Sequence, residues 1–395
     1  MRADWDIFCN VVDNYGDIGV AWRLARTLAR EHHVSVRLWV DDLKAFSRLW
    51  PAVDPHAGVQ QCEAVTICAW REPFVPVEPA SRVIEAFGCA LPEAYLAAMA
   101  GQSPAPVWLN LEYLSAEPWV VTHHGLPSPH PRLPLTKHFF FPGFLPETGG
   151  VLIEADYMQR RADFEGKAYR HKLGLAARAP DEVWVSLFSY ENPALHALLD
   201  AWSCGARPVT CLVPEGRVLP QLAEWLGTAE LAAGDCQVRQ ALRVMVLPFT
   251  DQDSYDHLLW ACDLNFVRGE DSCVRAQWAA RPMVWQAYPQ TAEAHWDKLE
   301  ALLALYLDAA PQVVADAVRS FWQGWNGVPG APDMATAWAA WLAAQADIER
   351  HALNWPAQLA RAGRLSQKLV DFSENGLNLK TAVDRSPHSQ TPYEH

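Results

Sequence analysis

The first part of the chain alternates short apolar runs with segments of helical periodicity. Residues 5–12 form an apolar run of strand length, and a polar loop follows at 13–19. Apolar residues then recur every three or four positions from 18 to 29, which predicts a helix, and residues 34–40 form the next strand candidate. This β-loop-α-β opening is how a doubly wound sheet begins. Further strands are predicted at 64–69, 82–87 and 107–111.

Residues 123–149 break this rhythm because they are rich in proline, histidine and glycine. The prolines argue against regular structure, so we expect a long irregular segment. The three phenylalanines at 139–141 indicate that this segment is ordered and packed. Residues 158–172 are charged and predicted to be helical, and together with 173–181 they lead into a second domain.

From residue 183 the alternation of strands and helices restarts, which predicts a second parallel sheet with helices on its faces. The predicted strands are 183–188, 208–213, 243–249, 262–267 and 282–286. The predicted helices between them are 194–202, 219–226, 255–261 and 274–280. More helices are predicted at 292–306, 311–325, 334–344 and 348–372.

These elements predict an α/β protein with two Rossmann-like domains, residues 1–180 and 181–348. A helix over 349–372 is expected to pack back on the first domain, and residues 373–395 form a polar tail. Two such domains that face each other create a cleft between their strand ends, as in a transferase that binds its donor in one half and its acceptor near the other.

Composition excludes several classes of protein. The chain has 395 residues, and its 32 basic and 46 acidic residues give a formal net charge of −14, which argues against non-specific nucleic-acid binding. The sequence contains no run of about 18 apolar residues, so no membrane helix is predicted. The first residues do not resemble a signal peptide. The nine cysteines and 14 histidines show no zinc-binding spacing, so we expect no metal and a reducing cytoplasm.

Residues 268–272, Arg-Gly-Glu-Asp-Ser, lie at a predicted strand-to-helix turn. Ligands of open α/β sheets bind outside such strand ends, and a helix N-terminus attracts phosphate. Arg268 could neutralise a diphosphate, Ser272 could donate to it, and a carboxylate could accept from a sugar hydroxyl. The alternative is that Asp271 and Ser272 cap the helix while Gly269 makes the turn.

The loop after the first strand carries two aspartates, Asp13 and Asp17. It lacks both a Gly-x-Gly-x-x-Gly pattern and a Walker lysine, and carboxylates repel a diphosphate. We therefore expect this loop to supply a catalytic base or to bind the acceptor. Gly16 would let the backbone come close to a ligand. Capping of the helix is the alternative for either aspartate. This acidic turn is expected to face residues 268–272 across the cleft.

Aromatic residues lie at neighbouring strand ends of the second half. Phe188, Tyr190 and Phe249 could hold a nucleobase by stacking, and Gln252 could reach a base edge or a phosphate. Core packing is the alternative for each aromatic residue. Asp251 and Asp253 match an Asp-x-Asp metal motif, but a helix cap explains them as well.

Several long motifs resemble one family. They are VVDNYGDIGVAWRLAR (11–26), WLNLEYLSAEPWV (108–120), HGLPSPHP (124–131), FFFPGF (139–144), SLFSYEN (186–192) and CDLNFVRGEDSCVRAQWA (262–279). They resemble the bacterial protein-arginine rhamnosyltransferases that modify elongation factor P, over nearly all of residues 4–300. The resemblance implies a glycosyltransferase-B fold with an acceptor-side first domain and a nucleotide-sugar-binding second domain. It also implies dTDP-β-L-rhamnose as donor, inversion, no metal, and an acceptor arginine on elongation factor P, which then rescues ribosomes stalled at polyproline.

The resemblance also assigns roles to matching positions. Asp13, Asp17 and Glu270 resemble essential acids, with Asp17 the better candidate for the base. The donor-binding positions that it implies are Asn14, Tyr15, Gly16, Phe188, Tyr190, Phe249, Gln252, Arg268, Gly269, Asp271, Ser272 and Tyr288.

Two other classes of function stay open at this point. A nucleotide-sugar epimerase or dehydrogenase would bind a nicotinamide, and the missing Gly-x-Gly-x-x-Gly pattern counts against it. A non-catalytic partner of the translation apparatus would bind donor without turnover and would leave the acids at 13 and 17 without a role.

Overall fold

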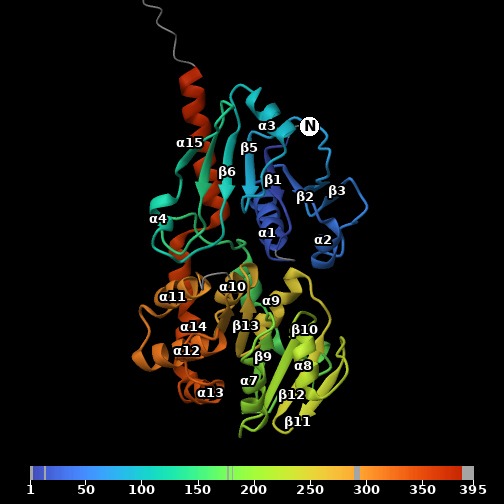
Figure 1. Cartoon of the computed structure of the whole chain (residues 1–395), viewed down its shortest axis with the longest axis vertical. Coiled ribbons are helices and arrows are strands. Elements are labelled where there is room, and N and C mark those ends of the chain that lie inside the picture. Colours follow the sequence, from blue (N-terminus) through green and yellow to red (C-terminus); the bar gives the residue numbers. More distant parts are fainter. Residues whose placement is uncertain (1–2, 13–14, 176–177, 180, 289–293, 385–395) are drawn as a thin grey trace, which may run out of the picture.

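Two sheets follow one another along the chain, each with its own layers of helices. The computed structural model describes residues 3–12, 15–175, 178–179, 181–288 and 294–384. The first sheet is built from residues 5–140 and the second from residues 183–286. In Figure 1 the N-terminal domain lies above the C-terminal domain, and the carboxyl ends of β1 (Trp5–Cys9) and β13 (Leu264–Arg268) point toward the junction between them.

The N-terminal sheet has eight strands in the order β3-β4-β2-β1-β5-β6-β8-β7. Its other strands are β2 (Val36–Val40), β3 (Val59–Cys62), β4 (Val65–Ala69), β5 (Arg82–Ala86), β6 (Val107–Leu111), β7 (Pro127–Pro129) and β8 (Thr136–Phe140). All neighbours are parallel except the two edge pairs, β3 with β4 and β7 with β8. The strands β1 and β6 are buried along their whole length, as inner parallel strands are.

Helices cover both faces of this sheet and connect its strands. They are α1 (Gly16–Glu31), α2 (Leu43–Leu49), α3 (Glu93–Ala100) and α4 (Val120–His123). Side chains of α1 and of alternate strand positions such as Ile7 form one buried cluster, and Phe8 packs with Tyr95 of α3 in another. This alternation is the period of two expected of a strand.

The C-terminal sheet has six strands in the order β11-β12-β10-β9-β13-β14. Its strands besides β13 are β9 (Val183–Leu187), β10 (Val209–Pro214), β11 (Cys236–Arg239), β12 (Leu242–Leu247) and β14 (Met283–Gln286), and only β11 is antiparallel to its neighbour. The helices between these strands are α7 (Leu195–Ser203), α8 (Leu219–Leu226), α9 (Gln252–Ala261) and α10 (Asp271–Trp278). The expectation of two facing α/β domains is therefore confirmed.

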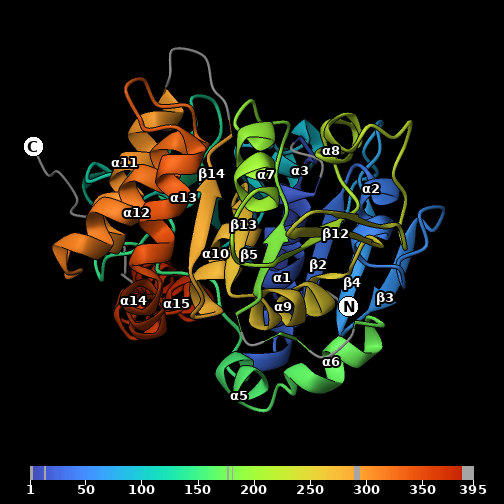
Figure 2. The same cartoon turned by 90° about the horizontal axis from the view of Figure 1, so that it is seen from below.

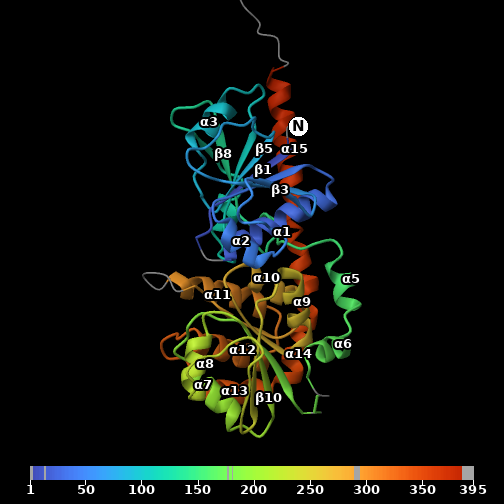
Figure 3. The ribbon, with the colours of Figure 1, turned by 90° about the vertical axis from the view of Figure 1, so that its right-hand side faces the viewer.

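The remaining helices link the domains and extend the second one. They are α5 (Tyr157–Ala162), α6 (Gly166–Lys172), α11 (Ala294–Leu307), α12 (Gln312–Trp325), α13 (Met334–Ala343), α14 (Gln345–Leu359) and α15 (Leu365–Asp384). Figure 2 shows α11, α12 and α13 gathered on the side of the second sheet where β14 lies, and α12 contacts β14. Figure 3 shows α15 running beside the N-terminal domain, where it contacts α1 and β6, whereas α14 contacts α10 in the C-terminal domain.

The predicted irregular segment at 123–149 contains two strands, so that prediction is wrong for these residues. β7 keeps Pro127 and Pro129 because it is the exposed edge strand, where a missing N–H does not interrupt a ladder. β8 is free of proline and pairs in parallel with β6. The edge strands β3 and β11 were also missed, because their exposed polar residues give no apolar signal.

The single helix predicted over 348–372 is two helices. α14 ends at Leu359, a 3-10 turn follows at Ala360–Ala362, and Gly363 has a φ of +85°, after which α15 begins. α15 then continues to Asp384, so the predicted tail is helical over residues 373–384. Within the part of the chain that the structure describes, no helix is both long and apolar enough to cross a membrane.

Candidate active site

Asp17 lies in the first turn of α1, directly after the loop that follows β1. Asp17 is 1% exposed, and each of its carboxylate oxygens accepts a hydrogen bond. The backbone N–H of Val12 donates to Oδ2 and the hydroxyl of Tyr113 donates to Oδ1, both at 2.9 Å. Asp13 and Asn14, the other polar candidates of this loop, lie outside the described residues.

Glu270 approaches the same place from the second domain. β13 ends at Arg268, Gly269 makes the turn with a φ of +60°, and α10 begins at Asp271, so Glu270 occupies the N-cap position. The backbone N–H of Leu114 donates to its Oε2 at 2.9 Å, which is a contact between the domains. Burial, with the negative charges of Asp17 and Asp271 in addition, raises the pKa of Glu270 to about 8.

Arg268 is held between two aromatic rings at the carboxyl ends of the strands. Its guanidinium carbon lies 4.5 Å from the ring centre of Phe188 and 4.4 Å from that of Tyr190. The hydroxyl of Ser272 donates to the carbonyl of Arg268 and accepts from its N–H at 3.1 Å. To donate to a phosphate, as the sequence suggests, the Ser272 hydroxyl would have to give up its bond to the Arg268 carbonyl. The Arg268 guanidinium has the stacked geometry that a planar cation favours.

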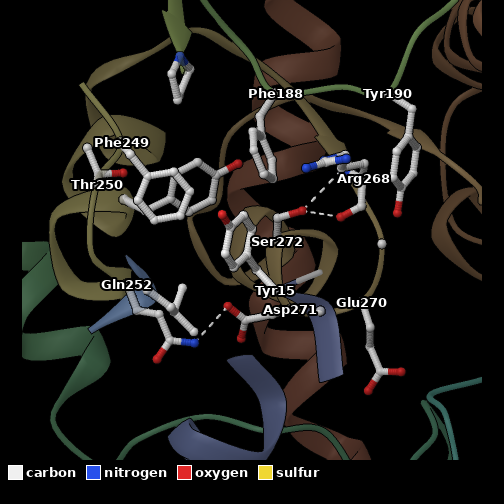
Figure 4. Close-up of a pocket in the computed structure, with 15 residues that line it drawn as sticks. Tyr15, Phe188, Tyr190, Phe249, Thr250, Gln252, Arg268, Glu270, Asp271 and Ser272 are labelled. Carbon is white, nitrogen blue, oxygen red and sulfur yellow. Dashed lines mark hydrogen bonds between the residues drawn. The ribbon is translucent and has the colours of Figure 1, made fainter. Parts of the chain in front are cut away.

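Two adjoining cavities meet at Gly16, Gly269 and Glu270 (Figure 4 shows the first of them). The first is lined by most of the predicted donor-binding residues, namely Tyr15, Phe188, Tyr190, Phe249, Gln252, Arg268, Asp271 and Ser272. The second contains Asp17, Tyr113, Leu114, Tyr288 and Lys298. The structure therefore gathers the described candidates from both halves of the chain around one continuous site.

The first cavity has an aromatic lining. The ring of Tyr15 lies 4.9 Å from that of Phe249, and the ring of Phe188 lies 5.5 Å from that of Tyr255. Tyr255 was not among the predicted residues, because its position inside a helix reads as ordinary core. An aromatic-lined space with a cation in its wall suits a nucleobase whose attached phosphates carry negative charge.

Asp271 and Gln252 turn toward the other domain. Arg23 donates to the Asp271 carboxylate through Nε at 2.9 Å and through Nη2 at 3.3 Å. The amide nitrogen of Gln252 donates to the carbonyl of Gly19 at 2.8 Å and to Asp271 Oδ2 at 3.2 Å (Figure 4). In this structure both side chains therefore connect α1 to the second domain, a role that the sequence did not predict.

The Asp-x-Asp pair has ordinary partners. Asp251 caps α9 by accepting from the N–H of Ser254 at 2.7 Å, and Asp253 pairs with Arg26 across the domain boundary at 3.3 Å. The capping interpretation thus fits Asp251. Over residues 3–12, 15–175, 178–179, 181–288 and 294–384, no three histidine, cysteine, aspartate or glutamate side chains gather in a way that could hold a metal ion.

Sequence reasoning missed the residues whose roles depend on contacts between domains. Tyr113 and Leu114 belong to the motif at 108–120, but the motif alone does not show that they reach Asp17 and Glu270. Arg23 lies inside an amphipathic helix and gave no signal of its own. Each of these partners is 96 or more residues away in the chain.

Comparison with known proteins places this chain in one family. Residues 5–374 match the family described as elongation-factor P (EF-P) rhamnosyltransferase EarP. The chain is 50% identical to a protein-arginine rhamnosyltransferase of Pseudomonas aeruginosa, over 94% of this chain and 98% of that protein. It is 48% identical to the protein of the same description from Pseudomonas putida, over 95% of this chain and 100% of that protein.

A solved structure agrees with the sequence matches. It was described under "Structural basis for EarP-mediated arginine glycosylation of translation elongation factor EF-P". Its TM-score is 0.67 at 37% identity, and the match covers 95% of this chain and 99% of that chain. With its two facing Rossmann-like domains, the chain has the glycosyltransferase-B fold, and it belongs to the EarP family of protein-arginine rhamnosyltransferases.

Proposed function

We propose that this chain transfers L-rhamnose from dTDP-β-L-rhamnose to an arginine side chain of elongation factor P, with inversion at the anomeric carbon. The observation that carries the proposal is the junction of the two cavities, where Glu270 of the second domain and Asp17 of the first line a common space. A donor in the aromatic cavity would present its sugar at this junction. The second cavity would then admit the acceptor side chain.

The first cavity supports a nucleoside diphosphate as donor. A base can stack among Tyr15, Phe188 and Phe249, and Arg268 stands where the phosphates would follow. The N–H groups at the start of α10 and the charge of Arg268 can stabilise negative charge as dTDP leaves. We therefore propose that departure of dTDP needs no metal ion.

The acceptor chemistry requires a carboxylate. The arginine side chain is protonated at ordinary pH and is a weak nucleophile. A carboxylate can accept hydrogen bonds from its N–H groups and direct one nitrogen at the sugar. In the proposed step the nitrogen–C1 bond forms as the bond from C1 to the phosphate oxygen breaks. The nitrogen's proton passes to Asp17, and attack opposite the leaving group inverts C1. Asp13 is proposed to orient the guanidinium or the base.

The decisive experiment is mass spectrometry of elongation factor P after incubation with the enzyme and dTDP-β-L-rhamnose, with and without EDTA. We expect a gain of one deoxyhexose on a single arginine, unchanged by EDTA and slowed about 10²- to 10⁴-fold in Asp17→Asn. Asp347→Asn is the matched control, because Asp347 lies on α14 and pairs with the exposed Arg350. NMR of the product would report the anomeric configuration, and a β linkage would contradict inversion.

The two alternative functions that the sequence left open predict different results in the same experiment. An epimerase or dehydrogenase would convert the nucleotide sugar without elongation factor P. A non-catalytic partner would bind donor, as calorimetry would detect, and leave elongation factor P unmodified. An acceptor from the translation apparatus also means that the proposed reaction takes place in the cytoplasm.

A further inference from the structure

Tyr113 contacts the candidate base directly. Its hydroxyl donates to Oδ1 of Asp17 at 2.9 Å, while the N–H of Val12 donates to Oδ2 at 2.9 Å. Hydrogen bonds at both oxygens define the plane of the carboxylate. We propose that Tyr113 is a positioning residue for Asp17 in rhamnosyl transfer, an inference that rests on the function proposed above.

A second aromatic residue holds the Tyr113 ring in place. The rings of Tyr113 and Phe87 are stacked, with centres 4.5 Å apart and an interplanar angle of 17°. Phe87 has a φ of +56°, a left-handed conformation that is rare for a bulky residue, and its N–H donates to the carbonyl of Leu111 at 2.7 Å. Such strain persists where the surrounding structure imposes it, often beside a functional site.

The next residue ties the same segment to the other domain. The N–H of Leu114 donates to Oε2 of Glu270 at 2.9 Å, so two consecutive residues hold one acidic side chain from each domain. The segment that follows β6 therefore sets Asp17 and Glu270 relative to each other. Tyr113 itself is 45% exposed and lines the second cavity, so its ring is not needed to fill a core.

The position of the base matters because nitrogen attack is sensitive to distance and angle. A carboxylate that loses the hydrogen bond at one of its oxygens is held less firmly, and small misplacement of a reacting group can cost about 100-fold in rate. The Tyr113 hydroxyl acts through Asp17 and takes no proton from the acceptor. Its removal should therefore reduce turnover without changing the binding of the donor in the other cavity.

The test is Tyr113→Phe, which keeps the stacked ring and removes only the hydroxyl. We expect kcat for transfer to elongation factor P to fall about 10- to 100-fold, with KM for the donor within about twofold of wild type. Tyr169→Phe is the matched control, since Tyr169 lies on α6 against Phe164, away from the cleft, and should leave kcat unchanged. Wild-type kcat in Tyr113→Phe, or a loss confined to donor KM, would overturn the proposal.

Double variants separate this role from a general loss of structure. If Tyr113 acts through Asp17, adding Tyr113→Phe to Asp17→Ala should lower single-turnover transfer no further, because the carboxylate that Tyr113 positions is already absent. Independent, multiplicative losses would contradict the proposal. Absence of transfer in the wild type would instead be a failure of the proposed function.

The hydrogen bond itself can be tested without any turnover. In the same cycle followed by urea unfolding, the two substitutions should be coupled by about tenfold in the unfolding equilibrium constant, as for a hydrogen bond to a charged group. Additive effects on unfolding would show that the two side chains do not interact. The inference would then fail, whatever reaction the enzyme catalyses.

Discussion

Arg23 on α1 and Asp271 on α10 form a bidentate ion pair across the domain boundary. Nε and Nη2 of Arg23 donate to the two oxygens of Asp271 at 2.9 and 3.3 Å. Nη1 donates to Glu154 at 2.7 Å, and Glu154 also accepts from Arg275 at 2.6 Å. Burial opposes the charge of Glu154, but Arg275 and Arg23 together hold its pKa well below the usual value. This network joins the helix that carries Asp17 to the helix that follows Glu270.

Removal of Arg23 should destabilise the protein strongly. Its side chain is fully buried, so Arg23→Met would leave the charges of Asp271 and Glu154 with less compensation inside the interface. We expect a loss of about 3 to 5 kcal/mol in the free energy of unfolding, measured by urea titration. Arg23→Lys should restore only part, because an ammonium cannot reproduce the planar fork.

The exposed ion pair of Arg350 with Asp347 provides the control. The side chains are 69% and 45% exposed, so Arg350→Met should cost no more than about 0.5 kcal/mol. If Arg23→Met were as stable as Arg350→Met, water would have to solvate the interface charges, and the pair could not fix the domains relative to each other.

Arg268 should matter for donor affinity more than for folding. Its guanidinium is stacked between Phe188 and Tyr190 at the end of the aromatic cavity. Arg268→Met removes the cation and should weaken dTDP binding about 10- to 100-fold by calorimetry, the range for a charged hydrogen-bonding contact. Arg268→Lys keeps the charge but loses the planar stack and should be intermediate. Equal affinity in all three proteins would exclude Arg268 from the diphosphate site.

The raised pKa of Glu270 gives transfer a dependence on pH. Burial is the main cause, and the pKa of about 8 means that the side chain is mostly protonated at neutral pH. A neutral acid can donate to a phosphate or sugar oxygen, whereas its charged form would repel the diphosphate. Glu270→Gln, which mimics the neutral form, should therefore keep more activity at pH 7 than Glu270→Ala.

The same group affects stability with a defined sign. The folded-state pKa lies above the ordinary value of 4.5, so the native state binds more protons. This contribution is complete below about pH 4.5 and is lost as the pH rises through 8. Wild type should lose stability relative to Glu270→Gln over this window by at most about 1.4 kcal/mol per pH unit. Parallel stability curves would mean that Glu270 is ionised throughout this window. A wild-type transfer rate that is flat through pH 8 would mean that ionisation of Glu270 does not control transfer.

Much of the fold follows from apolar periodicity. The strand at 107–111 and the helix at 219–226 lie where the pattern predicts them, because one is fully buried and the other ends at Gly227 in a left-handed conformation. Phe188, Tyr190 and Arg268 meet because the carboxyl ends of parallel strands share one edge of a sheet. Local sequence contains enough information for these features.

The contacts across the cleft could not be predicted in the same way. The hydrogen bond from Tyr113 to Asp17 spans 96 positions, and the pair of Arg23 with Asp271 spans 248. Both depend on how two separately folded sheets are set against each other, which periodicity does not encode. The resemblance predicts Asp271 as a donor ligand; in the structure its side chain lines the first cavity, and its pairing with Arg23 is a contact that the local sequence does not indicate.

Gly150 should be among the least replaceable residues outside the site. It has a φ of +74°, and a Cβ there would lie 2.4 Å from the carbonyl oxygen of Gly363. That carbonyl accepts from the N–H of Val151 at 3.0 Å, which attaches the segment before Glu154 to the crossover between α14 and α15. Gly150→Ala should cost roughly 2 to 4 kcal/mol in urea unfolding, from backbone strain and from the clash together.

Gly227 separates these two causes. It has the same φ of +74° at the end of α8, but a Cβ there would meet nothing within 4 Å. Gly227→Ala should therefore show strain alone, about 1 to 2 kcal/mol. The excess in Gly150→Ala measures how rigidly the chain segment between the domains is held against the C-terminal crossover. If the two variants lost equal stability, the crossover would yield to the added methyl group, and the position of α15 on the first domain would not depend on this contact.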